Sequence, residues 1–348
     1  MTQAELGAQI RLGKTELARL VVNAYFERHP DFKSRYGADA YKKSLQDAEY
    51  HFVFLAEALE TEEPILFLDY IHWNTSLFES IGLPIQVLIE TIQLMIETLN
   101  FHFGSHDAAP ACILLGQSIE HINLEEPPQH NFIDETSPLG PIARRYLEAL
   151  LAADRRKAGA IIEQAIQNGS SIKDIYLEVF QKTQQEIGRL WQLNQISVAQ
   201  EHFCSAATQM IMAQLYPMLF KGEVKQKHII VACVGGELHE LGARMVADIF
   251  ELEGWDSYFI GANTPLRDLL RTITEKKTEL VALSVTMTYH LSELKEYIRE
   301  LHKSSSNLKI MVGGYPFNMT PTLWQKVGAD GWASDAVQAV QVAERLLV

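Results

Sequence analysis

The chain has few cysteines and little positive charge, and each scarcity excludes a class of protein. Its three cysteines, Cys112, Cys204 and Cys233, are an odd and scattered set, and no signal peptide precedes them, so we expect a reducing cytoplasm. Only 30 basic residues oppose 44 acidic ones, and the net charge of -14 repels nucleic acid and anionic lipid. No apolar run reaches the length of a membrane span. We therefore expect neither nucleic acid nor a membrane as partner.

A dinucleotide loop is also missing, although glycines cluster after the apolar run HIIVACV. Gly235, Gly236 and Gly242 lack the G-x-G-x-x-G spacing. The same segment, CVGGELHELG, contains Glu237 and His239. A histidine that binds a metal through one ring nitrogen usually needs a carboxylate on the other, and Glu237 is placed for that role. Gly242 would let a bulky ligand tail pass close to the backbone. We expect a metal-ligand loop; the alternative is an ordinary surface histidine.

The segment from residue 225 to 348 alternates apolar runs with amphipathic helices. This pattern predicts a doubly wound, five-stranded parallel sheet, in which ligands bind beyond the carboxyl ends of the strands. His239 follows the first strand, and four further residues end the third and fourth strands. These are Ser284, Thr286, Gly313 and Gly314; the predicted strands are HIIVACV, DSYFIG, ELVALSVT, LKIMVGG and DGWAS.

Residues 138–221 contain four helical stretches separated by short breaks, which is typical of an antiparallel four-helix bundle. Ser197 and Gln200 predict a capping box at the start of the last helix. Trp191 then lies at the end of the third helix, and Glu201 and His202 lie in the first turn of the fourth. A short hairpin should bring these three side chains together.

Residues 1–130 form a separate predicted domain. Their apolar residues recur at intervals of three and four, which predicts an all-helical domain. The stretch INLEEPPQHNFIDETSPLGP, rich in proline and acid, is expected to be a linker. No DNA-binding helix-turn-helix with basic faces is evident. With 47% hydrophobic residues, 348 residues suffice for two or three domains with cores of their own.

The motifs ELHELG, SVT and VGG resemble the acid-x-His-x-x-Gly, Ser-x-Thr and Gly-Gly pattern of the cobalamin-binding domain family. The resemblance covers about residues 225 to 348. It implies that His239 is the lower cobalt ligand and that Glu237 holds its other nitrogen. Ser284, Thr286, Gly313 and Gly314 would line the slot for the nucleotide tail. The family more often has aspartate where Glu237 stands, which leaves the hydrogen-bond geometry open.

Trp191, nine intervening residues, and then Glu201 and His202 resemble the upper-face motif of adenosylcobalamin-dependent photoreceptors. The resemblance implies that Trp191 packs on the adenosyl group and that Glu201 and His202 hydrogen-bond to it. The alternative is a core tryptophan beside a solvated Glu-His pair. Gln192 departs from the pattern, because related photoreceptors can carry a histidine there that captures cobalt after photolysis. His202 is then the nearest other donor.

The whole chain resembles photocobilins, which pair cobalamin with a biliverdin held in a globin-like domain. By this resemblance the N-terminal domain is globin-like, and the residues expected to bind biliverdin are Arg35, Asp47, His51, His72 and Trp73. Asp47 and His51 are four residues apart, so one helix face could present both. A non-covalent bilin is expected, because Cys112 lies in an apolar helix without an activating group. Haem is the competing ligand, and ordinary packing of these side chains is the third alternative.

We therefore expect a cytoplasmic signalling protein that senses light through adenosylcobalamin, with biliverdin as second chromophore. No catalytic domain is evident, so the chain is not expected to be an enzyme. Its output would pass through an unknown partner protein or a homo-oligomer interface. The alternative from another class is a corrinoid methyl carrier of a methyltransferase system, which uses a similar bundle and lower ligand. A haem or redox sensor acting through the first domain is the third possibility.

Overall fold

A computed structural model describes residues 1–122, 131–220 and 224–347. The chain divides into two compact units, Met1–Pro127 and Pro128–Val348. The predicted linker falls on this division; its residues 123–130 lie outside the described part, and residues 131–139 lead into the second unit.

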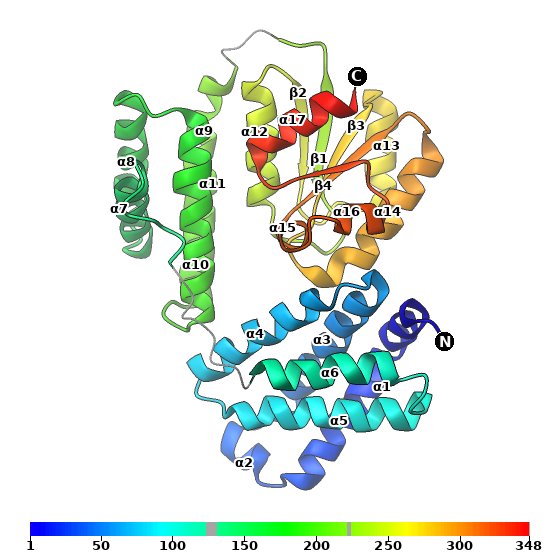
Figure 1. Cartoon of the computed structure of the whole chain (residues 1–348). Coiled ribbons are helices and arrows are strands. Elements are labelled where there is room, and N and C mark those ends of the chain that lie inside the picture. Colours follow the sequence, from blue (N-terminus) through cyan, green and yellow to red (C-terminus); the bar gives the residue numbers. More distant parts are fainter. Residues whose placement is uncertain (123–130, 221–223, 348) are drawn as a thin grey trace. The chain divides into compact units, whose positions relative to one another are not determined.

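The N-terminal unit is all-helical, as predicted (Figure 1). Its two longest helices pack closely, because the Cβ that Gly7 lacks would lie only 2.8 Å from the carbonyl oxygen of Ala56. A capping box between Thr2 and Glu5 starts the first helix. The helices are α1 (Gln3–Arg28), α2 (Phe32–Tyr36), α3 (Ala40–Thr61), α4 (Pro64–Ser80), α5 (Ile85–Phe103) and α6 (Ala109–Ile122).

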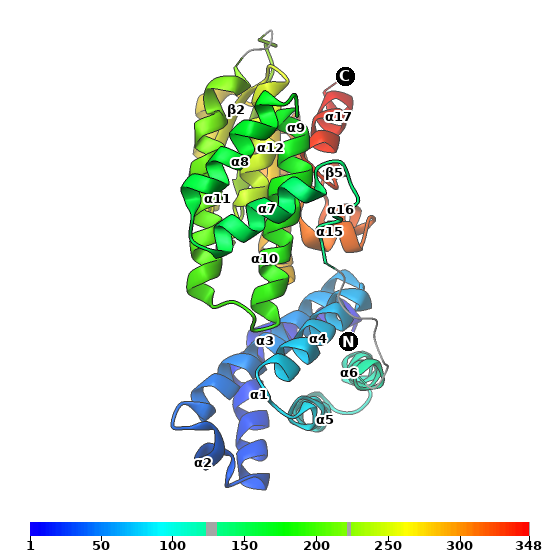
Figure 2. The same ribbon diagram turned by 90° about the vertical axis from the view of Figure 1, so that its left-hand side faces the viewer.

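The second unit begins with the predicted four-helix bundle, which Figure 2 shows from its outer side. The predicted capping box of Ser197 and Gln200 is present at the start of the last helix. The third helix is continuous but contains a π-helical stretch, η1 (Ile175–Gln181), between α9 (Ile172–Asp174) and α10 (Lys182–Gln192). The other helices are α7 (Gly140–Leu151), α8 (Arg155–Gln167) and α11 (Val198–Leu219).

The five predicted strands form one parallel sheet in the order β2-β1-β3-β4-β5. The strands are β1 (His228–Cys233), β2 (Asp256–Gly261), β3 (Leu280–Ser284), β4 (Lys309–Gly313) and β5 (Gly331–Ala333). The chain runs from β1 outward to β2 and then back across to β3, so the β1/β3 boundary is the switch point at which a doubly wound sheet binds ligands.

Helices cover both faces of the sheet. Helices α12 and α17 pack together on one face, while α13 and α14 lie on the other. Two short helices, α15 and α16, connect β4 to β5. The bounds are α12 (Leu241–Leu252), α13 (Leu266–Lys276), η2 (Thr288–His290), α14 (Leu291–Ser304), α15 (Tyr315–Met319), α16 (Leu323–Val327) and α17 (Ala336–Leu346).

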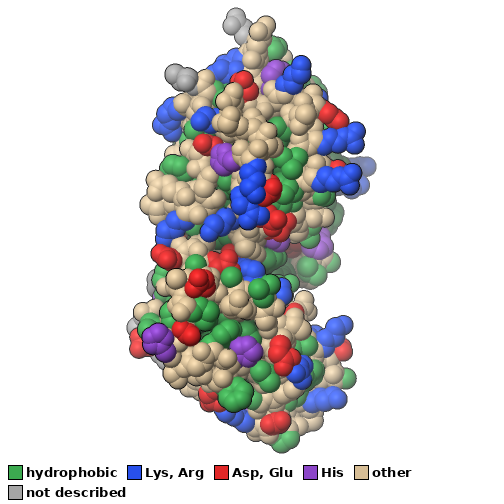
Figure 3. Space-filling view, turned by 90° about the vertical axis from the view of Figure 1, so that its right-hand side faces the viewer, with side chains coloured by type: hydrophobic (Ala, Val, Ile, Leu, Met, Phe, Trp, Pro, Cys, Tyr) green, Lys and Arg blue, Asp and Glu red, His purple; other side chains and the backbone are tan. Residues whose placement is uncertain are grey.

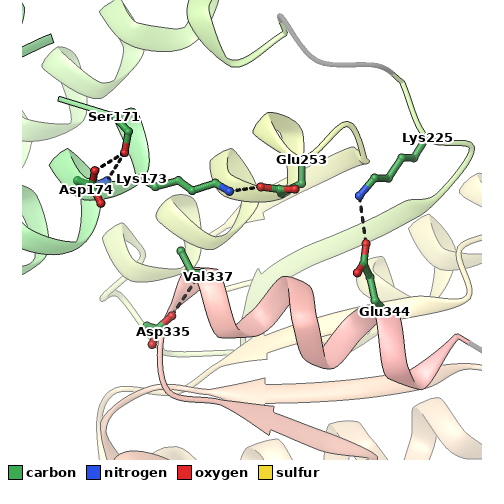
Figure 4. Close-up of polar contacts among 8 residues, drawn as sticks. All are labelled: Ser171, Lys173, Asp174, Lys225, Glu253, Asp335, Val337 and Glu344. Carbon is green, nitrogen blue, oxygen red and sulfur yellow. Dashed lines mark hydrogen bonds and ion pairs between the residues drawn. The ribbon is translucent and has the colours of Figure 1, made fainter. Parts of the chain in front are cut away.

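The bundle and the sheet share one apolar core, since a single cluster of buried side chains runs from α7 and α11 through α12 to the strands. Two polar contacts join the third bundle helix to α12. Lys173 forms an ion pair with Glu253 (Figure 4), and the Tyr176 hydroxyl donates to Asp248 Oδ2 at 2.8 Å in a buried position. The bundle is therefore anchored along the C-terminal half of α12.

The charged side chains on the surface are of both signs. On the face drawn in Figure 3, basic side chains are interspersed with acidic ones instead of forming a continuous basic field. Within the described ranges, no helix combines the length and apolar character that crossing a bilayer requires.

His51 makes the stability of the N-terminal unit depend on pH. The side chain is 3% exposed, its Nδ1 lies 2.8 Å from the Tyr70 hydroxyl, and burial lowers its pKa to about 4. An unfolded histidine has a pKa of about 6.5, so the unfolded state binds more protons between these values. The free energy of unfolding should be highest above about pH 6.5. It should fall as the pH drops toward 4, by up to about 3 kcal/mol.

We expect His51→Gln to remove this part of the pH dependence in urea unfolding measured at pH 7.5, 6 and 5. His106→Gln is the control, because the His106 side chain is 99% exposed. If His51→Gln and the parent chain lose stability equally as the pH falls, His51 does not carry the effect.

Candidate functional site

The loop between β1 and α12 is organised around one buried carboxylate. Glu237 is 0% exposed and accepts four hydrogen bonds. Its Oε1 accepts from His239 Nδ1 at 2.6 Å and from the His239 backbone N–H at 2.9 Å. Its Oε2 accepts from the backbone N–H groups of Thr286 at 2.8 Å and Met287 at 2.9 Å. Glutamate thus spans from the loop to the segment after β3, which settles how the longer carboxylate is accommodated.

These hydrogen bonds fix the charge and the tautomer of the pair. Burial opposes ionisation of Glu237, but the bonds from the His239 ring and from backbone N–H groups outweigh it and lower its pKa to about 2. The ionised carboxylate in turn raises the pKa of His239 through their hydrogen bond. Because Nδ1 carries the proton that Glu237 accepts, Nε2 is the nitrogen left for a metal.

The His239 ring is accessible to a ligand. Its side chain is 57% exposed, and Nε2 makes no hydrogen bond with any described residue. Apart from its chain neighbours and the backbone of its own helix, no described residue places an atom within 4 Å of the position that a Cβ on Gly242 would occupy, so the space beside the first turn of α12 is open. This agrees with the expectation that Gly242 leaves room for a bulky group.

The other sequence-predicted residues of this half lie at the same edge of the sheet. Ser284 of β3 pairs in register with Gly313 of β4. Thr286 contributes its backbone N–H to Glu237. Gly314 has a positive φ of 114°, and a Cβ there would lie 1.9 Å from the carbonyl oxygen of Val285. Glycine is therefore required at position 314 because two backbone segments approach each other closely there, irrespective of any ligand.

Two residues that the sequence pattern did not indicate, Asn263 and Tyr297, hold the ligand loop in place by hydrogen bonds. The Gly236 N–H donates to Asn263 Oδ1 at 2.8 Å, and the Asn263 N–H donates to the Glu237 carbonyl at 2.9 Å. The Tyr297 hydroxyl accepts from the Gly235 N–H at 3.1 Å. In the sequence, only their position could have indicated them: Asn263 lies just after β2, and Tyr297 lies in the second turn of α14.

An open pocket of about 570 Å³ adjoins this braced loop. Behind it, the ring of His290 would clash with a Cβ on Gly236, which explains the glycine there. His290 Nε2 is buried without a hydrogen-bond partner in the described part of the chain. The pocket is lined by Gly235, Gly236, Asn263, Pro265, Leu266, Glu293, Glu296 and Tyr297.

The three bundle residues predicted for the upper face lie on adjoining helices. Trp191, in the last turn of α10, is 38% exposed. Glu201 Oε2 lies 2.6 Å from His202 Nδ1, and Glu201 Oε1 accepts from the Ser205 hydroxyl at 2.8 Å. The negative charge of Glu201 contributes to the raised pKa of His239, so this end of the bundle faces the ligand loop. Gln192, in contrast, is buried.

The N-terminal unit brings together two of its five predicted residues. Asp47 and His51 line a cavity of about 40 Å³, while Arg35 lies on the surface in an ion pair with Asp31. His72 and Trp73, on α4, are half-buried and are not among the residues that line the cavity. The sequence interval correctly placed Asp47 and His51 on one helix face. A cavity of this size holds one or two water molecules, so a bilin requires the surrounding helices to separate.

The donor set suits a metal that arrives within a macrocycle. Within the described ranges, no group of three histidine, cysteine or acidic side chains could hold a free metal ion. A single accessible imidazole, held by a buried carboxylate, is instead what a metal with ring nitrogens as its other ligands requires. The residues present therefore fit a corrinoid.

Comparison with known proteins agrees with this geometry. Residues 142–216 and 227–341 each match a family model described as a B12 binding domain. A dimethylamine corrinoid protein of Methanosarcina acetivorans is 31% identical over 128 residues, which are 36% of this chain and 59% of that protein. The chain thus spans somewhat over half of that relative. A dimethylamine corrinoid protein of Methanosarcina mazei is 30% identical over 121 residues, 34% of this chain and 71% of that protein.

A third relative and a solved structure cover longer segments. A corrinoid protein of Desulfitobacterium hafniense is 24% identical over 209 residues, 58% of this chain and 94% of that protein. The structure of the Methanosarcina barkeri monomethylamine corrinoid protein superimposes with a TM-score of 0.53 and 21% identity, over 60% of this chain and 99% of that one, and shows the shared fold. The chain belongs to the family of cobalamin-binding proteins, in which a helical cap and a Rossmann-like domain bind the corrinoid between them.

Proposed function

We propose that this chain is a light-sensing signalling protein that binds adenosylcobalamin. The observation that carries the proposal is the surface formed by Trp191, Glu201 and His202. These side chains stand at the end of the bundle that faces the ligand loop, and Glu201 acts electrostatically on His239. A bulky indole beside a polar pair is suited to covering a large upper ligand.

In this proposal, each half of the site has a separate task. Glu237 keeps the proton on His239 Nδ1, so that Nε2 would be the nitrogen that binds cobalt. Trp191 excludes water from the upper face and offers a flat stacking surface. Glu201 and His202 hydrogen-bond to the ribose or the base of the upper ligand. Ser284, Thr286, Gly313 and Gly314 lie at the edge where the nucleotide tail would enter, beside the open space at Gly242.

The anchoring of the bundle explains how light would produce a signal. Adenosylcobalamin, when bound, supplies a cobalt–carbon bond that light breaks. Trp191, Glu201 and His202 would hold the upper ligand, and loss of that ligand would remove its contacts from the hairpin between α10 and α11. The attachments at Asp248 and Glu253 lie about 12 to 20 Å further along α12 than Glu240, at 1.5 Å per residue. The anchored end would stay in place while the hairpin end shifts, which would bias a two-state packing.

The output would pass through an unidentified partner protein or through a homo-oligomer interface. We place the protein in the cytoplasm, because Cys112, Cys204 and Cys233 are all free thiols, which suits a reducing compartment.

A second candidate function is the corrinoid methyl carrier, and the comparisons favour it over light sensing. The relatives are named dimethylamine corrinoid proteins, and the chain aligns to 94% of the D. hafniense corrinoid protein. A carrier needs an upper face that opens to a methyl donor and acceptor, which a bundle anchored at one end would allow. Against this role, well over a third of this chain has no counterpart in the D. hafniense protein.

The lower ligand can be tested by replacing His239. We expect His239→Ala to weaken corrinoid binding at least tenfold and to abolish the spectrum of histidine-ligated, base-off cobalamin. His228→Gln is the matched control, because His228 is half-exposed at the start of β1. Unchanged affinity and an unshifted absorption spectrum in His239→Ala would contradict the assignment.

Light sensing and methyl transfer predict different chemistry. Protein loaded with adenosylcobalamin in the dark should change its absorption spectrum under green light. Trp191→Ala should weaken adenosylcobalamin binding about tenfold, while methylcobalamin binding stays within about twofold, because a methyl group is too small to reach the indole. An unchanged spectrum under light, together with dark methyl transfer from methylcobalamin to a thiol or tetrahydrofolate, would establish the carrier instead.

Biliverdin is the second chromophore of this proposal, with Asp47 and His51 as its contacts. Asp47 can accept from pyrrole N–H groups, and both side chains line the one cavity. Adding biliverdin to the full chain should produce a red-shifted absorption band, which Asp47→Asn should shift and Arg35→Gln should leave in place. A haem spectrum in the extracted pigment, or no shift with biliverdin, would overturn this assignment.

A further inference from the structure

A hydrogen bond joins the bundle directly to the residue next to His239. Gln209 Nε2, on α11, donates to Glu240 Oε1 at 2.9 Å. Glu240 follows His239 in the chain and precedes the first residue of α12. The two halves of the site are therefore connected at the ligand loop itself, and not only at the distant anchor on α12.

The second carboxylate oxygen of Glu240 ties the same residue to the sheet. Oε2 accepts from the backbone N–H of Ala262 at 2.9 Å, in the loop after β2. A Cβ on Gly261 would lie 2.9 Å from this oxygen, so the glycine allows the carboxylate to approach the loop. One oxygen thus fixes Glu240 within the α/β domain, and the other holds α11 at a set distance from it.

Gln209 belongs to a stripe that leads to the upper-face residues. Glu201, Ser205 and Gln209 follow one another at intervals of four, so they lie on one face of α11. Ser205 hydrogen-bonds Glu201 at 2.8 Å. The stripe extends about 12 Å along the helix, at 1.5 Å per residue. A displacement of α11 at Gln209 is therefore carried along a rigid helix to Glu201 and, through the short hairpin, to Trp191.

We propose that Gln209 and Glu240 form a positioning pair that sets the spacing between the bundle and the ligand loop and thereby selects the size of the upper ligand. This inference rests on the proposed function. A large adenosyl group touches the bundle, so its binding depends on the spacing. A methyl group is much smaller, so the binding of methylcobalamin should depend little on this spacing.

The pair can be broken and restored without changing its size. In Gln209→Glu two carboxylates oppose each other, and the hydrogen bond is lost. In the double variant Gln209→Glu with Glu240→Gln, the amide at position 240 accepts from the Ala262 N–H and donates to the carboxylate at position 209. Gln214→Glu is the control, because it places the same charge at an exposed position of the same helix.

Dissociation constants of adenosylcobalamin and methylcobalamin are measured in the dark by spectral titration of each full-length variant. We expect the parent chain to prefer adenosylcobalamin and Gln209→Glu to reduce this preference about tenfold, while the double variant and Gln214→Glu stay within about twofold of the parent.

If Gln209→Glu weakens the binding of both ligands equally, or if the double variant does not restore the preference, the pair has a merely structural role. If Gln209→Glu keeps the parent's preference for adenosylcobalamin, the proposed role of the Gln209–Glu240 pair is wrong, but the proposed upper face is not affected. Equal affinity of the parent for both ligands overturns the pair and the proposed upper face together.

Discussion

The buried carboxylate of Glu237 is the constraint on which the site depends. An ionised group with no exposure is stable only when hydrogen bonds replace the water it has lost, and Glu237 has four of them. Two come from the loop after β1, and two come from the backbone after β3. The carboxylate therefore joins the two strands at the switch point of the sheet, and the imidazole orientation follows from the same bonds that hold the loop.

The attachment of the bundle to the sheet is unequal along α12. Toward the C-terminal end of α12, a shared apolar core is reinforced by the Tyr176–Asp248 hydrogen bond and the Lys173–Glu253 ion pair. Near the start of α12, the part-buried hydrogen bond from Gln209 to Glu240 joins the bundle to the α/β domain. A buried hydrogen bond to a carboxylate costs more to break than one that water can replace. The Gln209–Glu240 bond therefore costs less to break than the buried Tyr176–Asp248 bond.

The sequence predicted those features that depend on neighbours along the chain. The five strands and the positions of Glu237, His239 and Gly242 follow from alternating runs and from one short motif, and the Ser197 capping box depends on residues three apart. Asn263, Tyr297 and the Gln209–Glu240 bond could not be found in this way, because each contact joins segments that only the tertiary fold brings together.

The N-terminal unit shows the same difference between contacts that are local in sequence and contacts that depend on the tertiary fold. The interval of four residues correctly predicted that Asp47 and His51 share a helix face, because that relation is local. Which side chains of α2 and α4 reach the same cavity depends on helix packing, and the sequence pattern carries no information about it. Arg35 accordingly lies on the surface with Asp31.

Membership of the cobalamin-binding family does not by itself decide between carrier and sensor, because both roles use the same lower half. The imidazole and its carboxylate fit a corrinoid whatever the upper ligand is. The carrier and sensor roles differ in which side chains the bundle places over the upper face of the corrinoid. A carrier must expose a small group to a second protein, whereas a sensor must hold a large group until a stimulus removes it. In the function that we propose, Trp191 and the Glu201–His202 pair would cover the upper ligand, and the spacing set by the Gln209–Glu240 bond would decide whether a large group fits there. The choice between the two roles therefore depends, in this proposal, on side chains of α10 and α11 and not on the His239 loop.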